Sequence, residues 1–235
     1  MDFQTITATG SSRQAYPIAD VIIAGWTGRD QAALERHIAE LEQEGVRRPR
    51  QTPEFYRVGA SLPTQELRIQ VAGGNSSGEV EAFVLRSGNR WWVGAGSDHT
   101  DRRLEGYSVT LSKQVCPKPL ARELWPLDEV AAHWERLRTR SWIMTDSGRE
   151  AYQDNTLDCN RHPRELIELW EQRGGHFADG TLMLCGTHAA LGGIRYARRF
   201  EFELLDPVLD RRISHAYDII ALPADLPEGD GHEAA

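Results

Sequence analysis

The sequence predicts an α+β fold, with a mostly β body and a few covering helices. Segments of strand-like character outnumber those with helical periodicity, and the two kinds do not alternate regularly along the chain. A parallel sheet built from βαβ units requires that alternation, so this architecture is disfavoured. The chain has 235 residues, of which 40% are hydrophobic, and this is enough to bury a sizeable core.

Three segments place apolar residues at helical spacing. Residues 30–44 begin with Asp30, a residue type that caps helices, and a glycine follows them. Residues 128–139 carry a stripe of valine, tryptophan and leucine. Residues 163–173 begin with a proline, which suits a first helical turn, and Gly174 follows them. We expect a helix over each segment.

The remaining structured segments are typical of strands, because they are rich in β-branched and aromatic residues and are bounded by turn formers. The predicted strands are 20–24, 67–71, 79–86, 90–94, 107–113, 141–145, 181–186, 198–205 and 213–221. We expect a single domain over residues 1–222. The acidic tail 223–235 is rich in proline and glycine and poor in large apolar groups, so we expect it to be disordered.

Charge and cysteine usage limit the class of partner and the compartment. The net charge of −8 predicts neither nucleic acid nor a membrane surface as a partner, because both require a basic surface. No apolar run is long enough for a membrane helix, and the first residues do not have the pattern of a secretory signal. The three cysteines are scattered and form no CxxC, which is typical of reduced thiols. We therefore expect a cytoplasmic protein.

Two glutamates share one face of a predicted strand. Glu79 and Glu81 lie two residues apart on the strand 79–86, so their side chains point the same way, about 7 Å apart at the backbone. If this strand pairs with 90–94 as a hairpin, Asp98 returns beside them. Three carboxylates with no nearby cysteine suit Mg²⁺ or Mn²⁺ better than a structural Zn²⁺. The same pattern is also typical of a half-buried strand whose glutamates face solvent.

A second pair with potential chemistry lies on the first predicted helix. His37 and Glu40 are three residues apart, so the carboxylate can meet the imidazole and raise its basicity. Such a pair acts as a general base near neutral pH. An exposed helical pair without a role is the alternative.

Two further segments carry residues suited to an anionic ligand. Lys113 lies at the end of an alternating segment and is suited to stabilise an enolate or hold a carboxylate. Thr187 lies in the glycine-containing loop CGTHAALGG, where backbone amides and a hydroxyl group can bind an anion. The alternative for Lys113 is a solvated run of charges. No GxSxG or HExxH motif supports a serine hydrolase or a zinc peptidase.

Taken in order, these segments resemble the motifs of the fumarylacetoacetate hydrolase superfamily. That family combines an HxxE pair on an early helix, an ExE strand, an NDxTARD loop, a lysine and a late TGTPxGxG loop. The counterparts here are GWTGRDQAALERHIAE, GEVEAFVL, SDHTDR, LSKQ and CGTHAALGG, and their order holds from about residue 20 to residue 195. The sequence is most similar to a divergent branch classed as a domain of unknown function. The resemblance implies a mixed β-roll or barrel-like body.

The resemblance also implies a metal centre and a base. Glu79, Glu81 and Asp98 would hold Mg²⁺ or Mn²⁺, and His37 with Glu40 would activate water. The family acts on small anionic keto acids and usually forms homodimers. We therefore expect a homodimeric, metal-dependent hydrolase that cleaves a C–C bond in a 2-keto or 1,3-diketo acid.

By the same resemblance, Lys113, Thr187 and Arg102 would contact the substrate, and Lys113 would also act in catalysis. The metal and the lysine would together neutralise a developing enolate. A decarboxylase or keto–enol tautomerase acting on an oxaloacetate-like substrate at the same site is the first alternative. A non-enzymatic binding protein is the second.

The sequence departs from the family pattern at several positions. Arg57 stands where the family usually has lysine, and Asp101 replaces a small residue. His99 and His188 are additional histidines, the latter in place of a proline, and either could line the pocket or support it from behind. The stretch from Glu81 to Asp98 is shorter than usual, which predicts that a connecting helix near the metal is absent. These departures affect the expected identity of the substrate more than the expected metal site.

Overall fold

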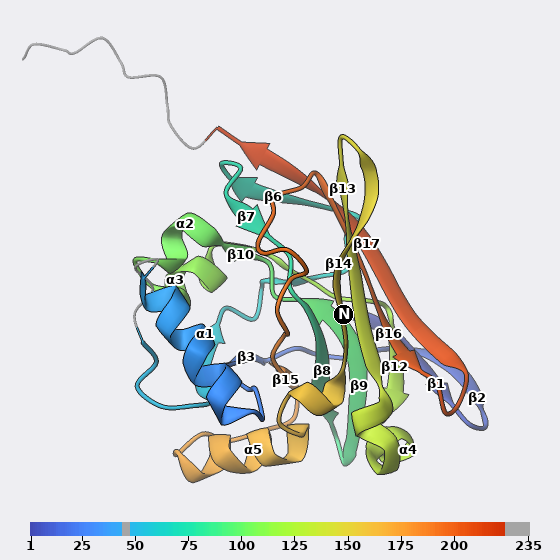
Figure 1. Cartoon of the computed structure of the whole chain (residues 1–235). Coiled ribbons are helices and arrows are strands. Elements are labelled where there is room, and N and C mark those ends of the chain that lie inside the picture. The colour runs from blue at the N-terminus through green and yellow to red at the C-terminus, as the bar shows by residue number, and fades with distance from the viewer. Residues whose placement is uncertain (44–47, 224–235) are drawn as a thin grey trace, which may run out of the picture.

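Figure 1 shows the computed structural model of the chain, which describes residues 1–43 and 48–223. The body consists of two large mixed β-sheets, and most of the helices lie along one side of them. The predicted α+β class with a mostly β body is therefore confirmed. The glycine expected to end the first helix lies outside the described residues, as does the predicted tail beyond residue 223.

The larger sheet has eight strands in the order β2-β1-β12-β9-β8-β15-β3-β4. Their bounds are β1 (Asp2–Thr7), β2 (Gly10–Ala15), β3 (Asp20–Gly25), β4 (Glu54–Val58), β8 (Val80–Ser87), β9 (Arg90–Ser97), β12 (Glu123–Pro126) and β15 (Thr181–Leu184). The pairs β1–β12 and β15–β3 are parallel, whereas the others are antiparallel. The hairpin predicted between β8 and β9 is confirmed, and no helix interrupts it.

The second sheet has five strands in the order β14-β13-β16-β17-β6. Their bounds are β6 (Arg68–Ala72), β13 (Arg138–Thr145), β14 (Gly148–Thr156), β16 (Arg199–Asp206) and β17 (Arg211–Leu222). Two short ladders join neighbouring loops: β7 (Ser76–Ser77) with β10 (Thr100–Asp101), and β5 (Pro63–Thr64) with β11 (Lys118–Pro119). The first of these ladders holds the segment that follows β9 close to the start of β8.

The helices are α1 (Gln31–Gln43), α2 (Arg102–Glu105), α3 (Val109–Gln114), α4 (Leu127–Val130) and α5 (Pro163–Gln172), with the 3₁₀ helices η1 (Ala131–Arg136) and η2 (Leu157–Cys159). Asp30 caps α1, because its Oδ1 accepts hydrogen bonds from the amides of Ala32 at 2.9 Å and Ala33 at 3.0 Å. In the part of the chain that the structure describes, no helix is long and apolar enough to cross a bilayer.

Strand β8 is buried on both faces and therefore lies at the centre of the protein. Val80 and Val84 belong to the core cluster shared with the aromatic residues of β16 and β17. Phe83 and Leu85 belong to a second cluster on the opposite face. Because side chains alternate along a strand, Glu81 shares the face of Phe83 and Leu85. An acidic side chain thus points into the interior.

The strand predicted at 107–113 is wrong, because most of these residues form α3. The Ser108 side chain caps this helix by accepting a hydrogen bond from the Leu111 amide at 3.4 Å. The apolar alternation that suggested a strand does not correspond to burial, since Tyr107 and Leu111 are exposed. The helical conformation instead buries Lys113 against the acidic residues.

The helix predicted at 128–139 is shorter and irregular. One turn of α4 continues into η1, and the chain is already extended at Leu137. His133 leaves helical geometry with φ −132° and ψ 26°, and its Nε2 lies 2.9 Å from Asp206 Oδ1. An apolar stripe is compatible with an α-helix or a tighter turn, so the spacing alone did not predict this break.

Several strands carry no alternating pattern and were not predicted, among them β1, β2, β4, β12 and β14. Every residue of β2 is exposed, so no hydrophobic period marks it. Its pairing with β1 rests on backbone hydrogen bonds and on contacts such as the one between the hydroxyl groups of Thr5 and Ser12 at 2.7 Å. The hairpin of β1 and β2 therefore has no hydrophobic period on β2 that would mark it in the sequence.

Candidate functional site

Three carboxylates converge where β8 begins and β9 ends. Val80 pairs with Ser97 in the hairpin, and the Asp98 amide donates a hydrogen bond to the Glu79 carbonyl at 3.0 Å. One carboxylate oxygen from each of Glu79, Glu81 and Asp98 lies within 4.8 Å of the other two. The hairpin therefore brings the three acids together. Their role as metal ligands stays a prediction.

The acidic cluster is largely buried. Glu81 is 2% exposed and Asp98 is fully buried, whereas Glu79 is half-buried at the edge. Burial, followed by the charges of Asp98 and Glu79, raises the pKa of Glu81 well above its ordinary value. The Glu81 Oε2 atom accepts a hydrogen bond from the Gly186 amide at 2.7 Å. Burial and the two neighbouring carboxylates thus disfavour a charge on Glu81.

Two buried lysines oppose the charge of Asp98. Lys113 forms an ion pair with Asp98 Oδ2 and lies 3.6 Å from Glu79 Oε2. Lys118 lies 3.1 Å from Asp98 Oδ1 and donates to the carbonyl oxygens of His99 at 2.6 Å and Lys113 at 2.5 Å. Burial disfavours ionisation of Asp98, but the two lysines outweigh it and lower the pKa of this carboxyl. The two lysines therefore favour the ionised form of Asp98.

Arg102 is tied to the same cluster from α2. Its guanidinium lies 2.9 Å from Glu79 Oε1 and 3.0 Å from Glu105 Oε2. Its Nε also donates to Ser77 Oγ at 2.7 Å. A predicted contact between Arg102 and substrate would thus come from a side chain already fixed by three protein groups.

The donor set fits a hard divalent cation. Mg²⁺ and Mn²⁺ prefer oxygen ligands, and all three groups are carboxylates. Asp98 Oδ1 is buried and lacks a hydrogen bond of suitable geometry, although the Lys118 ammonium group lies 3.1 Å away. The neighbouring carboxylates disfavour a charge on Glu81, and a bound cation would favour it. The residues therefore suit Mg²⁺ or Mn²⁺.

The loop after β15 is fixed against the acidic strand. Thr187 Oγ1 donates to the Val80 carbonyl at 2.9 Å and accepts from Gln153 Nε2 at 2.8 Å. Gly186 adopts φ +95°, and a Cβ there would lie 1.9 Å from Thr27 Oγ1. The backbone amide of Gly186 can reach Glu81 because this position lacks a side chain.

A cavity of about 730 Å³ opens beside the cluster. Its lining includes Glu79, Glu81, Arg102, Lys113 and Thr187, so one cavity collects these predicted residues. A second cavity of about 1110 Å³ lies beside the β1–β2 hairpin, and none of the predicted site residues line it. The smaller cavity is therefore the candidate active site, because the acids and the cations meet there.

His37 and Glu40 lie on α1, whose backbone the structure describes, but the positions of their side chains fall outside that description. Leu34 of the same helix lines the cavity. Figure 1 shows α1 next to α2 and α3, on the side of the protein where the acidic cluster lies. The proposed dyad stays a prediction.

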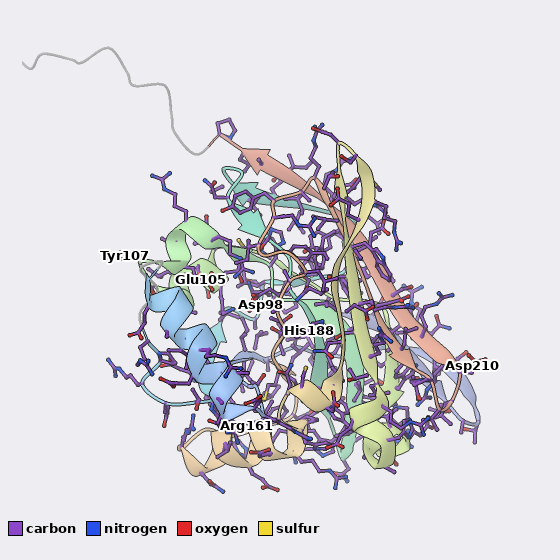
Figure 2. The ribbon with its side chains drawn as sticks, viewed as in Figure 1. Asp98, Glu105, Tyr107, Arg161, His188 and Asp210 are labelled. Carbon is purple, nitrogen blue, oxygen red and sulfur yellow. The ribbon has the colours of Figure 1, made fainter. Side chains whose placement is uncertain are left out.

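The two additional histidines have different surroundings. His99 is fully buried, and both of its ring nitrogens have partners, Tyr217 Oη at 2.8 Å and Ser76 Oγ at 2.9 Å. It therefore supports the site from behind. His188 lines the cavity itself, and burial lowers its pKa to about 4. Figure 2 labels His188 and Asp98, which both lie in the interior between the helices and the five-stranded sheet.

Sequence reasoning missed three residues that organise the site: Lys118, Gln153 and Asn160. Lys118 is a single charged residue within the otherwise apolar run VCPKPLA, and this isolation was the available signal. Gln153 and Asn160 bind the loop after β15 through their side-chain amides. Their positions in the sequence carry no pattern that would identify them.

The chain belongs to a protein family of unknown function (DUF2848), whose model matches residues 24–217. This agrees with the branch of unknown function that the motifs indicated. No curated protein matches the sequence.

Solved structures with the fumarylacetoacetate hydrolase fold are similar to this chain at low sequence identity. Fumarylpyruvate hydrolase from Pseudomonas aeruginosa, solved with Mn²⁺ and pyruvate, has a TM-score of 0.64 and 16% identity, covering 94% of this chain and 97% of its own. A fumarylacetoacetate hydrolase family protein from yeast has a TM-score of 0.61 and 16% identity, with 88% and 94% covered. The 5-carboxymethyl-2-hydroxymuconate delta-isomerase from Mycobacterium smegmatis has a TM-score of 0.61 and 13% identity, with 88% and 80% covered. The resemblance seen in the motifs is thereby confirmed for the fold.

Proposed function

We propose that this protein is a divalent-metal-dependent enzyme that cleaves a C–C bond in a small 2-keto or 1,3-diketo acid by hydrolysis. The observation that carries the proposal is the convergence of Glu79, Glu81 and Asp98, of which the two glutamates line a cavity together with Lys113 and Asp98 lies buried behind them. Mg²⁺ or Mn²⁺, held by the three carboxylates, would act as a Lewis acid toward the oxygens of the keto acid.

Lys113 would stabilise negative charge that develops on the substrate. Its ammonium group lies at the cavity wall between Asp98 and Glu79, and their charges raise its pKa although burial opposes this. A lysine held in the charged form at a fixed point can neutralise an enolate oxygen without reorganisation. Thr187 and Arg102 would orient the substrate, since both line the same cavity.

For hydrolysis, a base must take a proton from water. We assign this role to His37, with Glu40 orienting the imidazole, because the two are neighbours on one helix face. Helix α1 borders the cavity through Leu34, which is compatible with this assignment.

The fold of the matched enzymes supports the proposal. One of them is a hydrolase in complex with Mn²⁺ and pyruvate and another is an isomerase, and both share the architecture on which the acidic cluster lies. The isomerase favours the second candidate, a decarboxylase or keto–enol tautomerase acting at the same site. Loss of hydrolysis with retention of substrate proton exchange in His37→Ala would assign the dyad to the water step alone.

The first experiment measures Mn²⁺ binding by calorimetry after chelator treatment. Wild type is compared with Glu81→Gln and with Glu203→Gln, a control that alters another buried acid, one that pairs with Arg140 and does not line the cavity. We expect about one ion per chain in wild type and in the control, and a large loss of affinity in Glu81→Gln. Equal binding in all three proteins would contradict the proposed metal site.

The second experiment screens 2-keto and 1,3-diketo acids with the Mn²⁺-loaded protein. Loss of enol absorbance with formation of two smaller acids is the expected outcome for hydrolysis. Release of carbon dioxide, or proton exchange without cleavage, would instead support the second candidate. The expected homodimer is checked by sedimentation of the same preparation.

A further inference from the structure

One ring nitrogen of His188 has no hydrogen-bond partner among the groups that the structure describes. This histidine lines the same cavity as Glu79 and Glu81, and its Nε2 atom is buried without a hydrogen-bond partner. Thr27 Oγ1, also at the cavity wall, is buried and unpartnered as well. Buried polar groups in native proteins are rarely left unpaired, so two such atoms in one cavity indicate a place for a ligand.

The neighbouring polar side chains are already committed to the protein. The Gln153 amide group donates to Thr187 Oγ1 at 2.8 Å and to the His188 carbonyl at 2.7 Å, while its oxygen accepts from the Val80 amide at 2.9 Å. Asn160 Nδ2 donates to the carbonyls of Gly186 and Thr187. These bonds fix the backbone that carries His188, so the imidazole is presented from a rigid loop.

The other ring nitrogen of His188 faces the second sheet. Its Nδ1 lies 3.5 Å from the hydroxyl oxygen of Thr139, which is buried on β13. Burial lowers the pKa of His188 to about 4, so the ring is neutral near pH 7. A neutral imidazole has one donor and one acceptor nitrogen, and a hydroxyl group matches either because it can donate and accept.

The charges around the cavity disfavour an anionic group beside His188. Among the described residues that line the cavity, the cationic side chains are Arg102 and Lys113, and both are paired with carboxylates of the acidic cluster. The charge that acts on His188 is that of Asp154, a carboxylate. A second carboxylate on the substrate would therefore find no free cation here, whereas a hydrocarbon tail would leave Nε2 unpaired.

We propose that His188 is a specificity-determining residue that hydrogen-bonds a neutral hydroxyl group on the tail of the substrate, so that the enzyme prefers a hydroxylated 2-keto acid to a diacid. This inference rests on the proposed keto-acid function. It assigns a role to a histidine that stands where the motif of the superfamily has proline.

The test compares three 2-keto acids of similar size by calorimetry with the Mn²⁺-loaded protein. They are 4-hydroxy-2-oxopentanoate, 4-methyl-2-oxopentanoate, in which a methyl group replaces the hydroxyl, and 2-oxopentanedioate, a diacid. We expect wild type to bind the hydroxy acid about tenfold more tightly than the methyl analogue, the usual effect of one hydrogen bond to a buried group. The diacid should also bind more weakly than the hydroxy acid.

Variants at His188 show whether the preference originates there. His188→Leu should reduce the ratio of the two dissociation constants to about one, and His188→Gln, which keeps a donor and an acceptor, should retain part of it. Nitrogen NMR of the imidazole in wild type provides a readout that does not depend on folding of the variants. The hydroxy acid should shift the His188 Nε2 resonance, and the methyl analogue should not.

The outcomes separate the inference from the proposed function. If all three acids bind equally tightly, or if His188→Leu keeps the preference, the keto-acid function stands and the role of His188 is wrong. An unmoved Nε2 resonance on binding of the hydroxy acid leads to the same conclusion. If the protein binds Mn²⁺ but none of the three acids, the 2-keto-acid form of the proposed function is contradicted and the inference falls with it.

Discussion

Two groups of residues beside the cavity differ in how their buried polar atoms are paired; we call them the acidic end, around Asp98 and Glu79, and the open end, around His188 and Thr27. At the acidic end, Asp98 and Glu79 contact the ammonium group of Lys113, and further cations lie on either side. At the open end, His188 Nε2 and Thr27 Oγ1 have no hydrogen-bond partner among the described residues. The first end is organised by charge, which suits a metal and a carboxylate, whereas the second has unused hydrogen-bonding capacity, which suits a neutral group.

The largest expected effect comes from removing the buried cation behind the acidic end. Lys118→Met leaves Asp98 with Lys113 as its remaining ammonium partner and also removes hydrogen bonds to two buried carbonyls. Breaking a buried ion pair from one side typically costs about 3–5 kcal/mol. Urea unfolding measures this loss of stability. Arg13→Ala, which removes an exposed pair with Asp2, is the control and should change the stability little.

A loss of less than about 1 kcal/mol in Lys118→Met would contradict this account. It would mean that the charge of Asp98 does not depend on the second lysine, and that the acidic end is less tightly organised than its geometry indicates.

Gly186 joins the two ends, because its amide holds Glu81 and its loop continues to His188. Gly186→Ala would force a side chain into φ +95° and against Thr27 Oγ1. Strained backbone and overpacking each cost about 1–3 kcal/mol, so we expect a destabilisation of about 2–4 kcal/mol in thermal or urea unfolding.

Gly88→Ala is the matched control for that variant. Gly88 also has a positive φ, of +56°, but nothing lies within 4 Å of an added Cβ. It should therefore show the backbone cost alone, about 1–2 kcal/mol. Equal losses at the two positions would show that the close approach to Thr27 is unimportant.

Mn²⁺ should stabilise the folded protein through the acidic end and independently of His188. A ligand at one hundred times its dissociation constant stabilises the folded state by about 2.7 kcal/mol. We expect this gain for wild type and for His188→Leu on addition of Mn²⁺, and no gain for Glu81→Gln. Differential scanning fluorimetry measures the shift, and a gain in Glu81→Gln equal to that in wild type would argue against the carboxylate cluster as the metal site.

A pH-dependent effect is expected at His99, behind the acidic end. Burial, with the charges of Lys118 and Arg102, lowers its pKa from 6.5 to about 3 in the folded protein. Below pH 6.5 the unfolded chain takes up a proton that the folded protein does not, so stability falls as the pH decreases toward 3. At pH 5 the loss is about 2 kcal/mol.

The comparison of wild type with His99→Gln isolates this term, because the other titrating groups are common to both proteins. The variant should be less stable at pH 7.5, where two hydrogen bonds are altered, but should lose less stability between pH 7.5 and pH 5. His176→Gln, at an exposed position, serves as the control. Parallel pH curves for wild type and His99→Gln would contradict the predicted shift.

Much of the framework was predictable from local patterns. The spacing of Glu79 and Glu81 placed both on one strand face, and the turn between β8 and β9 returned Asp98 to them. Asp30 as a cap marked the start of α1, and Pro163 as a first-turn residue marked that of α5. The alternation in 107–113 predicted a strand where the structure has α3. Alternation indicates a strand only if the apolar side chains are buried, and Tyr107 is exposed.

The sequence by itself determined the fold class, the central hairpin and the acidic face, because each depends on residues close together in the chain and on periods of two or 3.6. Tertiary structure decided which cations pair with the carboxylates and which polar atoms remain without a hydrogen bond among the described residues. Gln153 reaches Val80 across 73 positions, and His188 meets Thr139 across 49. Contacts over such separations depend on how the two sheets pack, and no local pattern encodes them.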